Sequence, residues 1–171
     1  MVDLKSKIRS IPDFPQKGVI FRDITTLLKD AEGLQQAIAQ MHQKIIDLEY
    51  DVILGAESRG FLFGMPIAYN DEKGFVPVRK KGKLPAKTVS KEYALEYGTA
   101  TIEMHQDALQ KGQKVVIVDD LLATGGTAKA IVEMVEEMGA EVVALDVLIE
   151  LEGLKGREVL KGYRVESVLK Y

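Results

Sequence analysis

The sequence predicts an α/β fold in which helices flank a central, mostly parallel sheet. Two short apolar runs, 52–55 and 115–118, are typical of buried strands. After each run comes a segment with helix-like spacing of apolar residues and then a further strand-like segment. Alternation of strand, helix and strand is the pattern of parallel sheets covered by helices on both faces. Such sheets bind ligands beyond the carboxyl ends of their strands.

The first expected element is a helix over 30–49, with Asp30 in the N-cap position. Its apolar residues recur at three- and four-residue steps on one face: Leu34, Ile38, Met41, Ile45 and Leu48. The later expected elements are a helix over 61–69, strands over 74–79, 99–105 and 141–149, and a helix from about 127 to 138 that ends at Gly139.

Composition limits the possible functions. The 171 residues fit one domain, 1–171, and the absence of cysteine excludes disulfide scaffolds and thiolate metal sites. A net charge of −3 argues against a nucleic-acid partner. No apolar run reaches the ~18 residues of a membrane span, and the first residues lack the features of a signal peptide. We therefore expect a cytoplasmic protein with no membrane partner.

The segment 115–127 carries the strongest chemical signal. A buried strand runs into Asp119 and Asp120, and a loop with paired glycines then opens a helix. The glycines allow close approach of a ligand, and the start of the helix, with the hydroxyls of Thr124 and Thr127, suits a phosphate. The carboxylates suit the hydroxyls of a ribose. The spacing is neither a Walker loop nor a Rossmann fingerprint, so we expect a ribose-5-phosphate site at this strand end; the alternative is a glycine turn with no ligand.

Two further segments carry charge. At the end of the first buried run, 57–59 combines an acid, a hydroxyl and an arginine, for which a surface salt bridge is the alternative interpretation. From Lys73 to Lys91 there are basic residues and no acidic one. Such a block in an acidic protein indicates an anionic partner, although a solvated loop is the usual explanation. Gly82 and Pro85 favour a mobile loop in this run.

The string Val-Asp-Asp-Leu-Leu-Ala-Thr-Gly-Gly-Thr at 118–127 resembles the motif by which type I phosphoribosyltransferases bind 5-phosphoribosyl-1-pyrophosphate (PRPP), in the form of the adenine-specific branch. The resemblance implies the type I fold, with a small N-terminal hood formed by about 1–30. It implies that Asp119 and Asp120 hold the ribose hydroxyls. It assigns the 5-phosphate to Ala123, Thr124, Gly125, Gly126 and Thr127.

Four other segments resemble the same family. The segment 18–25 is similar to its adenine-recognition segment, which implies base-binding roles for Ile20, Phe21 and Arg22. The pyrophosphate contacts implied by the resemblance come from 57–59 and from the basic run: Glu57, Ser58, Arg59, Arg79, Lys80 and Lys83.

The resemblance also implies a strained peptide bond, a dimer and a catalytic residue. The family often has a strained peptide bond in the first pyrophosphate segment, which we place at Glu57–Ser58. The arginine that matches Arg79 reaches into the partner's site, which implies a homodimer. In 93–98, which resembles the family's flexible catalytic loop, Glu96 is implied to be the catalytic residue that meets N7 of the base.

Taken together, the resemblance implies a purine-salvage transferase that joins adenine to PRPP and gives AMP and pyrophosphate. It implies Mg²⁺ as cofactor, held by pyrophosphate, ribose oxygens and water. No direct protein ligand is expected, although Asp119 and Asp120 could contact the ion through water. Two alternatives remain open: a transferase for another purine base, and a regulatory protein that senses PRPP.

Overall fold

The computed structural model describes residues 2–95 and 97–171. The chain forms two compact units, Met1–Gln40 and Met41–Tyr171, each of which is described by itself. The expectation of a single domain over 1–171 therefore stays a prediction.

The N-terminal unit contains an antiparallel hairpin that the sequence analysis did not predict. Its elements are η1 (Lys5–Lys7), β1 (Arg9–Pro12), β2 (Ile20–Asp23), α1 (Thr25–Leu28) and the first part of α2 (Ala31–Ile45). Asp23 closes the hairpin, since Arg9 Nε donates to its carboxylate at 2.9 Å and the amide of Thr25 donates at 2.9 Å. Hydrogen bonds from Thr25, followed by the one from Arg9, lower the pKa of Asp23 to about 2.

The helix α2 confirms the predicted N-cap. The amide of Gly33 donates to Asp30 Oδ1 at 2.8 Å, which satisfies one of the free N–H groups of the first turn. The helix ends at Ile45, so the predicted end at residue 49 was wrong, and Leu48 lies outside it. Its fully buried residues are Ala37, Met41 and Ile45, one per turn.

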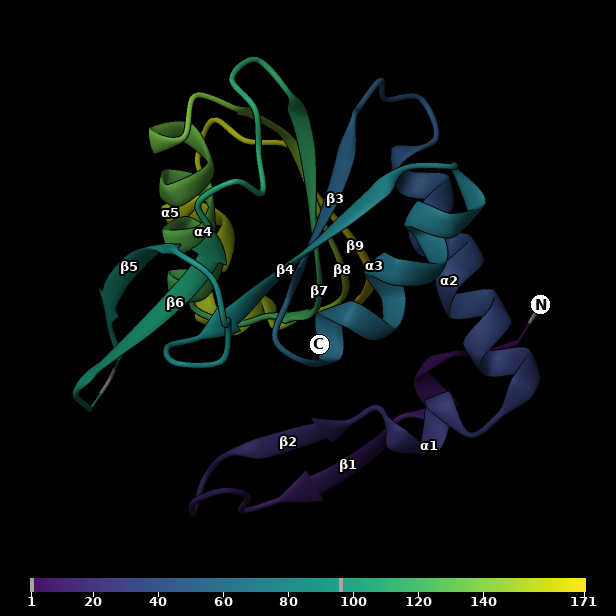
Figure 1. Cartoon of the computed structure of the whole chain (residues 1–171). Helices are drawn as coiled ribbons and strands as arrows, with labels where there is room; N and C mark the ends of the chain where they lie inside the picture. Colours follow the sequence, from purple (N-terminus) through teal and green to yellow (C-terminus); the bar gives the residue numbers. More distant parts are fainter. Residues whose placement is uncertain (1, 96) are drawn as a thin grey trace. The chain divides into compact units, whose positions relative to one another are not determined.

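The larger unit is built on a seven-stranded sheet with the order β5-β6-β4-β3-β7-β8-β9 (Figure 1). The strands β4, β3, β7, β8 and β9 are parallel, while β6 pairs antiparallel with both β4 and β5. The mostly parallel sheet is therefore confirmed. The strand bounds are β3 (Val52–Ala56), β4 (Gly74–Lys80), β5 (Thr88–Ala94), β6 (Thr99–His105), β7 (Lys114–Leu122), β8 (Glu141–Glu150) and β9 (Val165–Lys170).

Two of these strands were not predicted, and one is longer than expected. The strand β5 begins inside the basic run, so the loop expected there is limited to 81–87, between β4 and β5, and its mobility stays a prediction. The strand β7 continues through Leu122, beyond the apolar run 115–118, so the acid pair stands on the strand itself. In β6, the polar residue Glu103 is buried, and its carboxylate accepts a hydrogen bond from Gly82 N at 3.1 Å.

The helices of the larger unit lie on both faces of its sheet. They are α3 (Arg59–Asn70), α4 (Gly126–Glu137), the 3₁₀ turn η2 (Glu152–Leu154) and α5 (Gly156–Val159). The helix α4 ends in the predicted way: Gly139 has φ +82°, its amide bonds to Glu136 O, and the amide of Ala140 bonds to Val135 O. This pair of bonds is a Schellman motif, which requires the left-handed residue that glycine supplies.

The connections create a switch point between β3 and β7. The chain leaves β3 through α3 to reach β4 on one side, and leaves β7 through α4 to reach β8 on the other side. Figure 1 shows α3 and α4 on opposite faces of the sheet. Where neighbouring parallel strands send their helices to opposite faces, a crevice opens at their carboxyl ends. The fold therefore places the ends of β3 and β7, residues 56–60 and 119–126, at the same crevice.

One carboxylate is buried in the core without a visible partner. Asp146, in the middle of β8, is 0% exposed, and neither of its oxygens has a hydrogen-bond partner among the described residues. Burial, and then the charge of Glu166, raises the pKa of Asp146 to about 8, against the opposing effects of Lys44 and Arg164.

No helix in the described ranges is long and apolar enough to cross a membrane.

We predict that Asp146→Asn gains stability relative to the parent as pH rises. Because the pKa of Asp146 is raised in the folded state, its contribution is fully present near pH 4 and is lost as pH approaches 8. Asparagine does not titrate, so the difference in free energy of unfolding should grow by up to ~1.4 kcal/mol per pH unit in that window. Urea unfolding at pH 5, 6.5 and 8 measures it. The exposed Asp107→Asn is the control, and a pH-independent difference for Asp146→Asn would contradict the prediction.

Candidate functional site

A cavity of about 290 Å³ opens at the carboxyl ends of β3 and β7. It gathers most of the residues predicted from the sequence to bind PRPP. The predicted residues that line it are Glu57, Arg59, Lys80, Asp119, Asp120, Ala123, Thr124, Gly125, Gly126 and Thr127. These residues come from three separate segments of the chain, which the parallel neighbours β4, β3 and β7 bring to the same edge of the sheet.

The loop between β7 and α4 is shaped for an anion. Gly125 has φ +85° and forms the N-cap of α4, and no side chain caps this helix. The first N–H groups of a helix have no partner within the helix, and the helix dipole adds partial positive charge there. The half-buried Thr127 and the exposed Thr124 add hydroxyls at the same place. The loop can therefore bind a phosphate through backbone amides and hydroxyls.

The acid pair stands at the end of β7. Asp120 is 5% exposed, and its Oδ2 accepts a hydrogen bond from Arg59 Nε at 2.5 Å. Asp119 Oδ1 accepts from the amide of Asp120 at 2.8 Å. Burial, and then the negative charge of Asp120, raises the pKa of Asp119 well above its ordinary value. Asp119 is nevertheless partly exposed to solvent. Hydroxyl donors that reach Asp119 would favour its ionised form, which suits the recognition of a ribose.

A glycine allows α3 to begin against this pair. A Cβ placed on Gly60 would lie 2.7 Å from Val118 O and 3.1 Å from Asp119 Oδ1. These spaces are too short for any side chain. Gly60 therefore brings the first turn of α3, and with it Arg59, close to the acid pair. The sequence analysis did not assign this role.

The segment after β3 is held against the end of β4. Glu57 Oε2 accepts from the amide of Lys80 at 2.6 Å, and Arg79 Nη2 lies 3.5 Å from Glu57 Oε1. Burial raises the pKa of Glu57, but the hydrogen bonds from Lys80 and Arg79 outweigh it, so the pKa lies below its ordinary value. The peptide bond Glu57–Ser58, singled out in the sequence, is cis. Glu57, which lines the cavity, thus contacts both the backbone of Lys80 and the side chain of Arg79.

The basic run divides between different environments. Lys80 lines the cavity, and Arg79 is half-buried beside Glu57. Lys83 and Ser58 are exposed and do not line the cavity, although the charge of Lys83 lowers the pKa of Glu57.

Other members of the run have structural contacts, so the run is not one anion-binding surface. Lys91 Nζ pairs with Glu137 on α4 at 2.5 Å and with Glu133 at 3.3 Å. At a distance from the cavity, Lys73 lies over the ring of Tyr50. These two lysines are not among the residues assigned to pyrophosphate, and the assignment of Arg79, Lys80 and Lys83 stays a prediction.

Tyr93 is a site residue that the sequence analysis quoted without a role. It lines the cavity from the end of β5, and Thr127 Oγ1 donates to its hydroxyl at 3.0 Å. The sequence analysis did not predict β5, because its first residues belong to the basic run. It therefore did not recognise that alternation along this strand places Tyr93 on the side of the cavity. Tyr93 joins the β5–β6 hairpin to the phosphate loop.

The predicted base-binding residues lie in the N-terminal unit, on β2. Ile20 is 51% exposed, and Phe21 meets Phe14 edge to face, with ring centroids 5.2 Å apart and an angle of 77°. Arg22 Nη1 donates to Ser10 Oγ at 2.6 Å. The hairpin thus presents an apolar, aromatic surface. Glu96, the predicted catalytic residue, lies outside the described residues.

Comparisons with known proteins agree over nearly the whole chain. Residues 24–168 match the family model of the phosphoribosyl transferase domain. The chain is 61% identical to an adenine phosphoribosyltransferase of Lachnoclostridium phytofermentans, over 100% of this chain and 98% of that protein. It is 54% identical to the corresponding protein of Thermotoga maritima, over 99% of this chain and 98% of that protein.

Solved structures agree with this result. The crystal structure of adenine phosphoribosyltransferase from Thermoanaerobacter pseudethanolicus matches with a TM-score of 0.96 at 51% identity, over 99% of this chain and 98% of that chain. That of the Saccharomyces cerevisiae enzyme, a complex that contains adenine, matches with a TM-score of 0.91 at 37% identity, over 97% and 96%. On this full-length likeness in sequence and structure, the chain belongs to the phosphoribosyltransferase family, in its adenine phosphoribosyltransferase branch.

Proposed function

We propose that this protein converts adenine and PRPP to AMP and pyrophosphate in purine salvage. The observation that carries the proposal is the cavity at the ends of β3 and β7, where a phosphate loop stands beside a pair of carboxylates. Full-length relatives more than half identical in sequence are adenine phosphoribosyltransferases. The reaction displaces pyrophosphate from C1 of PRPP by N9 of adenine, with inversion at that carbon.

PRPP would be held at both ends of its ribose. The loop 123–127 would bind the 5-phosphate through backbone amides and hydroxyls. Asp119 and Asp120 would accept hydrogen bonds from the 2′ and 3′ hydroxyls. Because both groups sit on rigid elements, the end of β7 and the start of α4, they would fix the orientation of C1.

The pyrophosphate would lie toward the end of β4. Arg59, Arg79, Lys80 and Lys83 are the cations of this region, and cations stabilise the charge that develops on a leaving polyanion. The carboxylate of Glu57 is occupied by Lys80 N and Arg79, so its proposed part is to orient these groups. Ser58 would contribute through its exposed hydroxyl or backbone.

The residues present fit Mg²⁺ as the cofactor, bound mainly through the substrate. Among the described residues there is no group of three or more acidic or histidine side chains that could hold a metal. Mg²⁺ keeps several waters and favours phosphate oxygens, so Asp119 and Asp120 would contact it through water. When bound, it would neutralise charge on pyrophosphate. The catalytic residue would be Glu96, which would interact with N7 of the base. A cytoplasmic location also stays a prediction.

Adenine would bind on the aromatic surface of the N-terminal unit. Phe21, supported by Phe14, offers an apolar face to a flat base. The backbone of Ile20 and Arg22 offers alternating donors and acceptors to the edge of an amino-purine.

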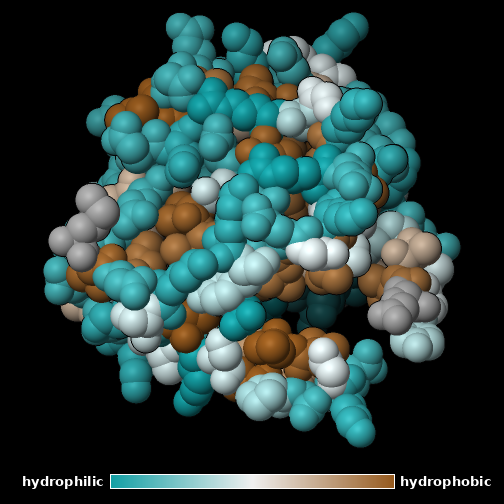
Figure 2. Space-filling view, turned by 180° about the vertical axis from the view of Figure 1, so that it is seen from behind, coloured by the Kyte–Doolittle hydropathy of each residue, from teal (hydrophilic) through white to brown (hydrophobic). Residues whose placement is uncertain are grey.

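We also propose a homodimer, on the evidence of an exposed apolar face of α3. Figure 2 shows apolar patches within the mainly hydrophilic surface of one view of the molecule. On α3, Leu62, Met65 and Tyr69 are 44%, 51% and 82% exposed and recur with helical spacing. An exposed apolar stripe of this kind is typical of a protein interface. The same helix begins at Arg59, so a second copy that covers it would lie close to the cavity.

The direct test of the proposed function is AMP formation from adenine, PRPP and Mg²⁺, with each component omitted in turn. We expect AMP only when all are present. Hypoxanthine, guanine and xanthine, each in competition with adenine, should inhibit weakly and give little product. Product from another base at a higher rate would assign the enzyme to that base, and no product from any base would favour a regulatory protein that binds PRPP.

We predict that Asp119→Asn and Asp120→Asn raise the KM for PRPP much more than the KM for adenine. Hydrogen bonds to charged groups contribute ~1.5–3 kcal/mol, so each substitution should cost roughly ten- to a hundredfold. Steady-state kinetics with each substrate varied gives both constants, and Asp107→Asn on the surface is the matched control. Unchanged KM for PRPP and unchanged turnover in both variants would remove the acid pair from the site.

We predict that Met65→Glu and Tyr69→Glu convert a dimer to monomers. A charge placed on an apolar interface loses its water without gaining a partner. Light scattering after size-exclusion chromatography measures the mass, with Gln43→Glu, exposed on α2, as the control. A parent protein that is monomeric at micromolar concentration, or variants that stay dimeric, would show that this face is not the interface.

A further inference from the structure

The short helix α5 is packed directly on the phosphate loop. A Cβ placed on Gly125 would lie 2.4 Å from Val159 Cγ2 and 2.8 Å from Gly156 O. In the reverse direction, a Cβ on Gly156 would lie 2.5 Å from Ala123 O. The two backbones therefore touch at a pair of glycines. A shift of α5 by an ångström would move the loop or leave it unsupported.

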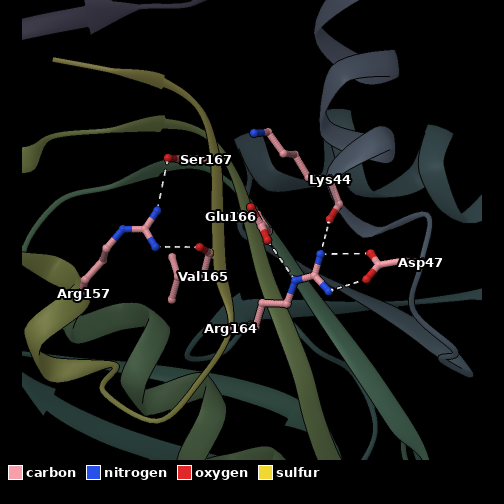
Figure 3. Close-up of polar contacts among 7 residues, drawn as sticks. All are labelled: Lys44, Asp47, Arg157, Arg164, Val165, Glu166 and Ser167. Carbon is pink, nitrogen blue, oxygen red and sulfur yellow. Dashed lines mark hydrogen bonds and ion pairs between the residues drawn. The ribbon is translucent and has the colours of Figure 1, made fainter.

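Arg157 holds α5 in this place. Its Nε and Nη2 donate to the two carboxylate oxygens of Glu150 at 2.6 and 2.8 Å, a bidentate pair. Its Nη1 donates to Val165 O at 2.6 Å, and Nη2 also reaches Ser167 Oγ at 3.4 Å. Figure 3 shows Arg157 reaching from the helix to Val165 and Ser167 on β9. One side chain thus joins α5 to the carboxyl end of β8 and to β9.

The acceptors of Arg157 are themselves fixed. Glu150 is 5% exposed, and Ser167 Oγ donates to its Oε2 at 2.6 Å. The hydrogen bonds from Arg157 are the main cause that lowers the pKa of Glu150, against the effect of burial. A buried, ionised carboxylate with defined partners accepts hydrogen bonds in one arrangement. The position of Arg157 is therefore restricted, and with it the position of α5.

A second arginine with similar bonding provides a comparison. Arg164 donates to Asp47 at 2.8 and 2.9 Å, to Lys44 O at 2.7 Å and to Glu166 at 2.9 Å (Figure 3). None of these residues lines the cavity. Arg164 therefore ties the end of α2 to the start of β9, whereas Arg157 ties the support of the phosphate loop to the sheet.

We propose that Arg157 is a positioning residue for the 5-phosphate. It holds α5 against Gly125, and α5 keeps the loop and the first amides of α4 in the geometry that binds phosphate. This inference rests on the proposed function of the loop. A preorganised loop binds more tightly because it loses less freedom when the ligand arrives. Arg157 would therefore act on ligands that carry a 5-phosphate, and not on the base alone.

The test compares Arg157→Gln, Val159→Ala and the control Arg164→Gln in the full chain. Val159→Ala removes the contact with Gly125 and leaves the ion pair intact; Val159 is 43% exposed, so the variant should fold. The measurements are the Kd values of AMP and adenosine by calorimetry, the KM values of PRPP and adenine, and the melting temperature. We expect a rise of about tenfold in the Kd of AMP and the KM of PRPP for Arg157→Gln and Val159→Ala, with adenosine and adenine changed less than about twofold.

Arg164→Gln should lower the melting temperature as Arg157→Gln does, with all ligand constants within about twofold of the parent. The proposal is overturned if the two arginine variants change AMP binding equally, or if AMP and adenosine lose affinity in parallel. If Arg157→Gln does not fold, Val159→Ala decides in the same way. A parent protein that neither binds AMP nor uses PRPP would refute the proposed function itself, which separates that failure from a failure of this inference.

Discussion

The structure depends on one topological constraint, the opposite departure of the chain from two neighbouring parallel strands. Because β3 leads to α3 on one face and β7 leads to α4 on the other, no connection covers the crevice between their carboxyl ends. Most of the polar residues in the candidate site follow these two ends, and Lys80 on β4 and Tyr93 on β5 complete it. The same topology buries the strands on both faces, which explains why both read as uninterrupted apolar runs.

Charge in the crevice is arranged in pairs that leave some groups available to ligands. Arg59 serves Asp120, and Glu57 is engaged with Arg79 and the backbone of Lys80. Lys80 and Asp119 both line the cavity. A ligand with hydroxyls in its middle and phosphates at both ends complements this distribution.

The sequence predicted the parts of the site that arise from local chemistry. The acid pair, the glycine loop, the N-cap of α2 and the end of α4 each need particular residue types, and the structure has them there. It did not predict β5, because this edge strand follows a run of basic residues with Gly82 and Pro85 and is held by pairing with β6 and by Lys91. The support from α5 was also missed, because it depends on contacts between segments thirty residues apart.

The contact between Gly125 and Gly156 has a consequence for the sequences that this fold can accept. Gly125 is required twice, by its positive φ and by the backbone opposite it. Gly156 does not have a positive φ, and its nearest glycine, Gly153, is three residues away, so its own segment gives no reason for a glycine here. A side chain at position 156 is excluded by the carbonyl oxygen of Ala123, which lies opposite it in the loop. Gly156 should therefore tolerate substitution as poorly as Gly125, although it lies outside the loop. A larger residue at position 156 would require a different conformation of the loop.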